Sequence, residues 1–232
     1  MPQTWTLRLA ALMLCVAGLA ADASAQTVTD NRLWFNLTLQ DKVKTKSASP
    51  WHWTFETILR SRDGVEELDQ VAFRPTIIYN FTPASSVGGG YLIGRSDPAL
   101  GPNVIENRIH AQYVWRGSMT GGTLTLRTRM EGRFIVDDTN GVARLRQQVR
   151  FSHPIKAGSR IAILGYDELF VHLNGSNRYK QGIDHNRAFA GISDTFSPTF
   201  RLEIGYLNQY IPGHGALDKM NHILSVTTGV SF

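Results

Sequence analysis

The sequence has almost no cysteine, and its single thiol lies outside the part of the chain that we expect to fold. Among 232 residues the only cysteine is Cys15. It lies within the apolar stretch of residues 9–21, which follows the basic Arg8 and precedes an Ala-Ser-Ala sequence. This order is typical of a secretory signal peptide, so we predict one over residues 1–25. The remaining chain, residues 26–232, then has no disulfide and no cysteine chemistry.

Long hydrophobic runs are also missing. A transmembrane helix needs about 20 predominantly apolar residues, and the stretch of residues 9–21 is shorter than that and is not matched later in the sequence. No glycine-rich segment in this sequence is followed by a predicted helix, so the sequence does not support a phosphate-binding loop. His185, His214 and His222 lack the spacing of zinc ligands. We therefore predict no transmembrane helix, no metal site and no cofactor.

The charge balance is positive, but the sequence has no basic cluster. There are 24 lysines and arginines against 19 aspartates and glutamates, a formal net charge of +5, and the sequence pI is about 9.5. Nucleic-acid-binding domains usually gather such charge on one helix, loop or face. Here the arginines alternate with glutamates and hydrophobic residues, and we expect no nucleic-acid partner.

What the sequence does contain is alternation with period two, which is clearest in residues 122–153. One parity is polar and the other is apolar, on both sides of the turn signal Asn140-Gly141. Alternation of this kind indicates the two strands of an antiparallel hairpin. The polar parity contains Arg127, Arg129, Glu131, Arg133, Arg144, Arg146 and Arg150. These charges must therefore lie on one face of the sheet.

The same alternation recurs along the rest of the chain. It predicts further strands in residues 33–40, 51–60, 70–81, 87–95, 105–116, 160–173, 185–193, 200–210 and 222–232. With the hairpin this makes about eleven strands, whereas single-chain bacterial outer-membrane barrels have an even number, with both termini periplasmic. We therefore predict about 12 strands, with 10 as the alternative. Either a strand is missed in residues 26–30 or 62–68, or residues 33–40 are not a full strand.

Two segments predict local irregularities in the sheet. Pro75 has no N–H for a ladder hydrogen bond, which predicts a bulge or an unpaired position. Residues 87–95 are rich in glycine, as expected where a sheet bends or where a bulky interior group approaches the backbone.

The apolar parity carries aromatic residues that gather toward one end of the predicted strands. That end has short connections, such as residues 117–121, while connections such as residues 174–184 at the other end are longer. Short periplasmic turns and an aromatic girdle are typical of outer-membrane barrels, whereas a soluble sandwich has no reason to collect outward aromatics at one level. The girdle contains Trp51, Trp53, Tyr79, Phe81, Tyr113, Trp115, Phe151, Phe200 and Phe232. We predict an all-β fold, a single up-and-down antiparallel transmembrane β-barrel in the outer membrane of a Gram-negative bacterium.

The polar parity then faces the lumen of the barrel. An arginine turned to lipid costs about 2 to 4 kcal/mol at the bilayer centre, which forces this orientation. The predicted charge ladder contains Glu56, Arg60, Arg74, Glu106, Arg108, Arg127, Arg129, Glu131, Arg133, Arg144, Arg146, Arg150, Glu168, Arg187, Arg201 and Glu203. A paired ladder would fill the lumen and be structural, whereas an arginine excess along an aqueous path would favour anions. We predict a structural barrel or a narrow solute pore with an anion bias, with small anionic solutes as partners.

The alternative is an enzyme that modifies outer-membrane lipids. Barrel phospholipases and lipid A acyl hydrolases resemble each other in a His and a Ser two residues apart on one strand face. The nearest candidates here, His172 and Ser176, are four residues apart and run into a loop. We therefore predict no catalytic residue.

Several short motifs occur in an order that resembles a known family. They are Glu56 with Arg60, Arg74-Pro75, Gly90-Tyr91, Glu106 with Arg108, Arg129-x-Glu131-x-Arg133, Arg144-x-Arg146, Glu168-x-Phe170, Asn186-Arg187, Gly205-Tyr206 and the last Phe. Their order resembles the bacterial family called domain of unknown function 2490, predicted outer-membrane barrels. The resemblance implies the fold and the location, and no reaction. The last strand, ending in Phe232, resembles the assembly signal of such barrels, so we expect the barrel assembly machinery, outer-membrane lipid and lipopolysaccharide as partners.

Overall fold

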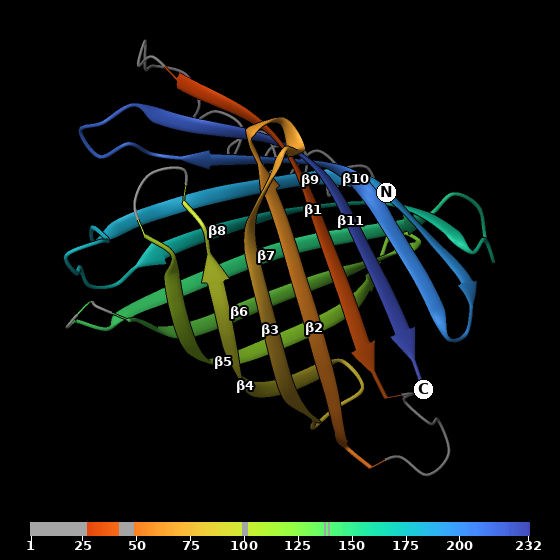
Figure 1. Ribbon diagram of the computed structural model, residues 1–232. Helices are drawn as coiled ribbons and strands as arrows, with labels where there is room; N and C mark the ends of the chain where they lie inside the picture. Colours follow the sequence, from red (N-terminus) through yellow and green to blue (C-terminus); the bar gives the residue numbers. More distant parts are fainter. Residues whose placement is uncertain (1–26, 42–48, 99–101, 137, 139) are drawn as a thin grey trace, which may run out of the picture.

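A closed barrel of eleven strands contains nearly all of the described residues (Figure 1). The computed structural model describes residues 27–41, 49–98, 102–136, 138 and 140–232, and the predicted signal peptide lies outside them. The strands are β1 (Thr27–Gln40), β2 (Trp51–Arg62), β3 (Glu67–Asn80), β4 (Ser85–Ser96), β5 (Val104–Met119), β6 (Gly122–Ile135), β7 (Val142–Pro154), β8 (Ile161–His172), β9 (Gly182–Ser197), β10 (Phe200–Ile211) and β11 (Asp218–Ser231). The all-β barrel is therefore confirmed. No helix among the described residues is long and apolar enough to cross a membrane.

The barrel closes between β1 and β11, which run parallel to each other. Thr27 pairs with Asp218 and Gln40 with Ser231. The described residues therefore form eleven strands rather than the 12 or 10 predicted. Residues 27–30 lengthen β1 instead of adding a strand, and Asp63–Val65 is a 3-10 turn between β2 and β3. Because the number is odd, β1 begins at one rim of the barrel and β11 ends at the other.

The barrel has a C-terminal rim, where β11 ends, and an opposite rim, where β11 begins. The C-terminal rim holds Gln40 and Phe232, which are joined by a backbone hydrogen bond of 3.1 Å. It also holds the connections of residues 81–84, 120–121 and 155–160. The opposite rim holds the ends of β2, β4, β6, β8 and β10. Neighbouring strands follow one another obliquely around the barrel wall between the two rims (Figure 1).

Alternation along each strand separates an exposed outer face from a buried interior, as the period of two requires. On β11, Leu224 is 51% exposed while its neighbour Ile223 is fully buried. The interior is not uniformly charged. On the side of β1 and β8 to β11 it holds an apolar cluster of Trp34, Leu164, Phe189, Leu207 and Ile223. This cluster places an indole ring inside the barrel, next to charged strands.

Both predicted irregularities are confirmed. Between β3 and β4 the ladder pairs Phe73 with Ile93 and Thr76 with Gly90, and it leaves Pro75 without a partner on β4. A Cβ atom added to Gly90 would lie 2.8 Å from the imidazole Cε1 of His110 and 2.2 Å from the carbonyl oxygen of Pro75. The glycine is therefore needed because an interior ring lies against the backbone of β4.

Two β-bulges near the opposite rim each add one aspartate to the interior. The register of β8 with β9 shifts between Phe170 and Val171, so that Asp184 is the extra residue on β9. The register of β2 with β3 shifts between Arg60 and Ser61, and Asp69 is the extra residue on β3. A bulge re-aims the side chain of the inserted residue. Asp184 therefore contacts interior side chains although simple alternation with the inward His185 would point it outward.

Candidate functional site in the barrel interior

Glu131 on β6 is the centre of a buried ion-pair network. Its Oε2 accepts a hydrogen bond of 2.5 Å from the Nη2 of Arg144, and its Oε1 accepts one of 2.7 Å from the Nη1 of Arg146. Both arginines come from β7, at facing and neighbouring register positions. Glu131 is 4% exposed. One carboxylate thus neutralises charge on two guanidinium groups, through charge-assisted hydrogen bonds that are stronger than neutral ones.

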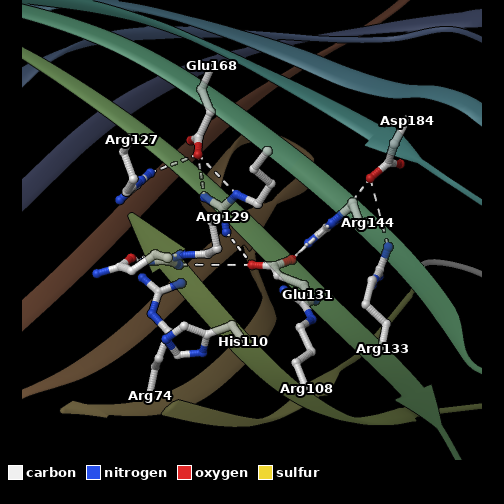
Figure 2. Close-up of polar contacts among 12 residues, drawn as sticks. Arg74, Arg108, His110, Arg127, Arg129, Glu131, Arg133, Arg144, Glu168 and Asp184 are labelled. Atoms are coloured by element: carbon white, nitrogen blue, oxygen red, sulfur yellow. Dashed lines mark hydrogen bonds and ion pairs between the residues drawn. The ribbon is translucent and has the colours of Figure 1, made fainter. Parts of the chain in front are cut away.

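The network extends from Glu131 in both directions across five strands (Figure 2). On one side Glu168 bridges Arg146 and Arg127, at 2.7 and 2.8 Å. On the other side Asp184 lies 2.7 Å from Arg144 and 3.8 Å from Arg133. In order of contact the chain of ion pairs is Arg127, Glu168, Arg146, Glu131, Arg144, Asp184, Arg133, Glu106 and Arg108.

Two smaller groups lie closer to the C-terminal rim. Arg74 donates two hydrogen bonds to Glu56, of 2.6 and 2.7 Å, in a forked arrangement. Glu203 accepts from Arg150 at 2.6 Å and from Arg201 at 2.9 Å. Arg150 and Glu203 are on β7 and β10, which are not neighbours, so this ion pair reaches across the lumen.

Other ladder arginines lack a close carboxylate. Arg129 donates to the side-chain oxygen of Gln112 at 2.6 Å and lies 4.0 Å from Glu131. Within the described residues Arg60 and Arg187 have neither a hydrogen bond nor an ion pair, and the Nε atom of each is buried without a partner. Their contacts are aromatic. The guanidinium carbons of Arg60 and Arg187 lie 4.1 and 4.7 Å from the ring centroid of Trp34.

Two cavities adjoin this arrangement. The inner cavity, about 410 Å³, is lined by Trp34, Arg60, Arg187 and Phe170 among others. The rim cavity, about 670 Å³, lies toward the C-terminal rim and includes Arg116 in its lining. The residues that line both cavities are Glu56, Arg127, Gln148, Arg150 and Glu203. Charged side chains therefore form the partition between the two spaces.

The residues considered for catalysis do not form a catalytic pair. The Nε2 of His172 is 2.9 Å from the Nη1 of Arg133, and its Nδ1 is 3.2 Å from the carbonyl oxygen of Lys180. The hydroxyl of Ser176 donates to Asp138 at 2.8 Å, and this hydrogen bond lowers the pKa of Asp138. The serine is therefore bonded to an acid and not to the histidine, and the lipid-modifying alternative gains no support.

The aromatic residues of the predicted girdle are placed on the outer face near the C-terminal rim. Trp51 is 58% and Phe232 65% exposed. Neighbouring strands bring some of these rings together: the centroids of Trp51 and Tyr79 are 4.8 Å apart, and those of Phe81 and Tyr113 are 6.2 Å apart. Side-chain exposure to the outside and proximity to one rim are the geometric features that a membrane girdle requires.

Three interior residues were not identified from the sequence. Alternation in the sequence places Asp184 in a connection, and only the bulge brings it beside Arg144. His185 lies 3.1 Å from Asp184, whereas its spacing in the sequence excludes only a zinc site. Trp34 belonged to the polar parity of its strand, and this parity was the available signal that the ring lies inside. Among the described residues no group of three or more His, Cys, Asp and Glu side chains could hold a metal ion.

Comparison with known proteins gives a family but no activity. Residues 31–221 match the family model described as "Protein of unknown function (DUF2490)". An uncharacterized protein of Methylorubrum extorquens is 32% identical over 229 residues, which cover 97% of this chain and 98% of that protein. No solved structure matches the chain.

Proposed function

The chain belongs to the DUF2490 family, and we propose that it is an outer-membrane β-barrel whose narrow lumen admits small solutes with a preference for anions. One observation carries the anion preference. Among the described residues, Arg60, Arg187 and Arg116 line the two adjoining cavities without a carboxylate partner. Unpaired positive charge beside an aqueous path raises the local concentration of anions.

The outer face supports the membrane location. It carries exposed side chains such as Ile77, Ile109 and Leu224, between 51% and 59% exposed, where lipid would cover them. Turning the barrel inside out would place its arginines in lipid, at about 2 to 4 kcal/mol each near the bilayer centre. The predicted signal peptide fits the same destination, because outer-membrane proteins are exported first.

One acidic residue on the outer face is compatible with lipid because its carboxylate is hydrogen-bonded. Asp167 on β8 points outward, and its two carboxylate oxygens accept from the side-chain amide of Asn186 at 3.0 and 3.1 Å. A polar group away from water costs little only when it is hydrogen-bonded. The partner amide on the neighbouring strand therefore lowers the cost of this position.

The partition between the two cavities limits what passes. The side chains that line both cavities are Glu56, Arg127, Gln148, Arg150 and Glu203, and they restrict passage to small ions and solutes. Full closure at this partition would leave the barrel a purely structural role.

Fractionation and gel mobility test the location. We expect the protein in the outer-membrane fraction, with an unboiled band that runs faster than the boiled one because the closed barrel stays compact in detergent. A single band in the soluble periplasmic fraction would contradict the membrane barrel.

Reversal potentials in a KCl gradient across a planar bilayer test the pore. We expect small currents with a reversal potential of the sign that chloride preference gives. Arg160→Gln is a matched control, because the Arg160 side chain is 60% exposed and lies outside the lumen. Cation preference, or no conductance from inserted and folded barrels, would contradict the anion-favouring pore.

A further inference from the structure

We propose that the inner cavity is a binding site for a small organic carboxylate, whose oxyanion is held by Arg60 and Arg187 beside the indole of Trp34. This inference rests on the proposed barrel with an anion-accessible lumen, and it names the site and the class of ligand. It does not require that the ligand crosses the barrel. The site lies where β1, β2 and β9 face the same cavity.

Unsatisfied donors converge on this cavity. Four N–H donors of its lining residues are buried without a partner: Nε1 of Trp34 and the Nε atoms of Arg60, Arg127 and Arg187. Trp34 is 4% and Arg187 9% exposed. Buried polar atoms in proteins are nearly always hydrogen-bonded, so a group of four at one place calls for a specific explanation. An oxyanion accepts hydrogen bonds and would satisfy indole and guanidinium N–H donors together.

The charges at this place point to the same ligand. Arg60 and Arg187 both stack on Trp34, and Arg187 also lies 4.6 Å from the ring centroid of Phe170. A cation–π contact stabilises a guanidinium group but leaves its charge in place. Two like charges so close together disfavour each other in a buried setting. A carboxylate between them would remove this repulsion and use the planar fork of donors that arginine offers.

Size and lining favour an organic acid over an inorganic anion. The cavity volume of about 410 Å³ falls in the usual range for small-molecule sites, about 300 to 1,000 Å³. The lining also contains five carboxylates, each of which is ion-paired with an arginine of the protein: Glu56, Glu106, Glu168, Asp184 and Glu203. Beside these paired charges it includes the apolar side chains of Leu207, Phe170 and Leu92. A ligand with one oxyanion and an apolar body matches this division. Benzoate is the probe that represents the class.

Titration calorimetry of the intact, detergent-solubilised barrel tests the site. We expect benzoate to bind, and Arg60→Gln and Arg187→Gln each to weaken the affinity by about tenfold or more, since each removes a charge-assisted hydrogen bond. Benzyl alcohol, which has the same ring without the charge, should not bind. Inorganic phosphate should bind about tenfold more weakly than benzoate, because it leaves the apolar wall uncovered. Arg160→Gln, outside the lumen, should leave the affinity unchanged.

Folding is checked for each variant by the mobility of unboiled samples. If a glutamine variant does not fold, Arg187→Lys replaces it: the charge stays, the fork is lost, and weaker benzoate binding is expected. The site is overturned if the wild-type barrel does not bind benzoate, or if Arg187→Gln and Arg187→Lys both bind it as tightly as the wild type. Benzoate binding without conductance would refute the pore and keep the binding site. Anion-selective conductance without benzoate binding would refute the binding site and keep the pore.

Discussion

The two sides of the barrel interior use arginine differently. On the side of β5 to β8, arginines surround shared carboxylates, and Glu131 alone accepts from Arg144 and Arg146. On the side of β1, β2 and β9, Arg60 and Arg187 contact the ring of Trp34 instead. The first side has most of its charges paired within the protein, with Arg129 bonded to Gln112 instead. The second keeps its guanidinium donors available.

This difference separates a structural role from a binding role for one residue type. A buried ion pair is stable only while both partners are present, because removal of one leaves an uncompensated buried charge. A buried arginine on an aromatic ring already carries that cost. We therefore expect opposite responses of stability when charge is removed from the two sides.

The largest effect is expected for Glu131→Gln. The substitution keeps the shape of the side chain but leaves Arg144 and Arg146 without their shared carboxylate charge, which should lower the free energy of unfolding by about 3 to 5 kcal/mol. Guanidinium chloride unfolding in detergent, followed by tryptophan fluorescence, measures the change. Glu203→Gln is the control: its pair with Arg150 is more exposed, at 17% and 22%, so a loss of about 1 kcal/mol is expected. Equal losses of unfolding free energy in the two variants would refute the larger contribution of the buried Glu131 to stability.

The next effect is stabilisation by ligand on the other side. A ligand that binds only the folded barrel raises the free energy of unfolding by about 2.7 kcal/mol at a concentration of about 100 times its Kd. We expect benzoate to do so for the wild type and to have little effect on Arg187→Gln at the same concentration. A benzoate effect of the same size in both proteins would place the binding elsewhere.

A smaller effect is expected for Arg187→Leu without ligand. The substitution removes a buried charge that has no carboxylate partner among the described residues, so the free energy of unfolding should stay within about 1 kcal/mol of the wild type or rise. The same unfolding experiment measures it. A loss as large as that of Glu131→Gln would mean that the two sides do not differ.

The smallest effect is expected for Arg116→Gln in the rim cavity. Arg116 lines this cavity and is exposed, so its loss should reduce the anion preference without removing it. The shift of the reversal potential toward zero in a KCl gradient measures this. A stronger anion preference in the variant would show that Arg116 does not attract anions into the lumen.

The sequence predicts the alternation of faces well because this property is local. Period two alone indicates that Arg144 points inward and Leu224 outward. Alternation alone gives about eleven strands, which is the number in the structure; the prediction of 12 or 10 came from the even strand number of single-chain bacterial barrels, which this barrel does not follow. Pairing across the lumen, such as Arg150 with Glu203, depends on barrel diameter, and therefore on the register of all the strands and not on any one segment. The bulge that inserts Asp184 has no signature in the alternation, so the acid that links Arg144 to Arg133 could not be found.

The most direct test of the proposed binding side is crystallographic. Crystals of the barrel grown with 4-bromobenzoate would show the bromine by its anomalous signal. We predict a peak in the inner cavity, with the carboxylate between Arg60 and Arg187 and the ring against the apolar wall. Diffraction data with bromine peaks only outside this cavity, or with none, would contradict the claim that these arginines are kept for an anion.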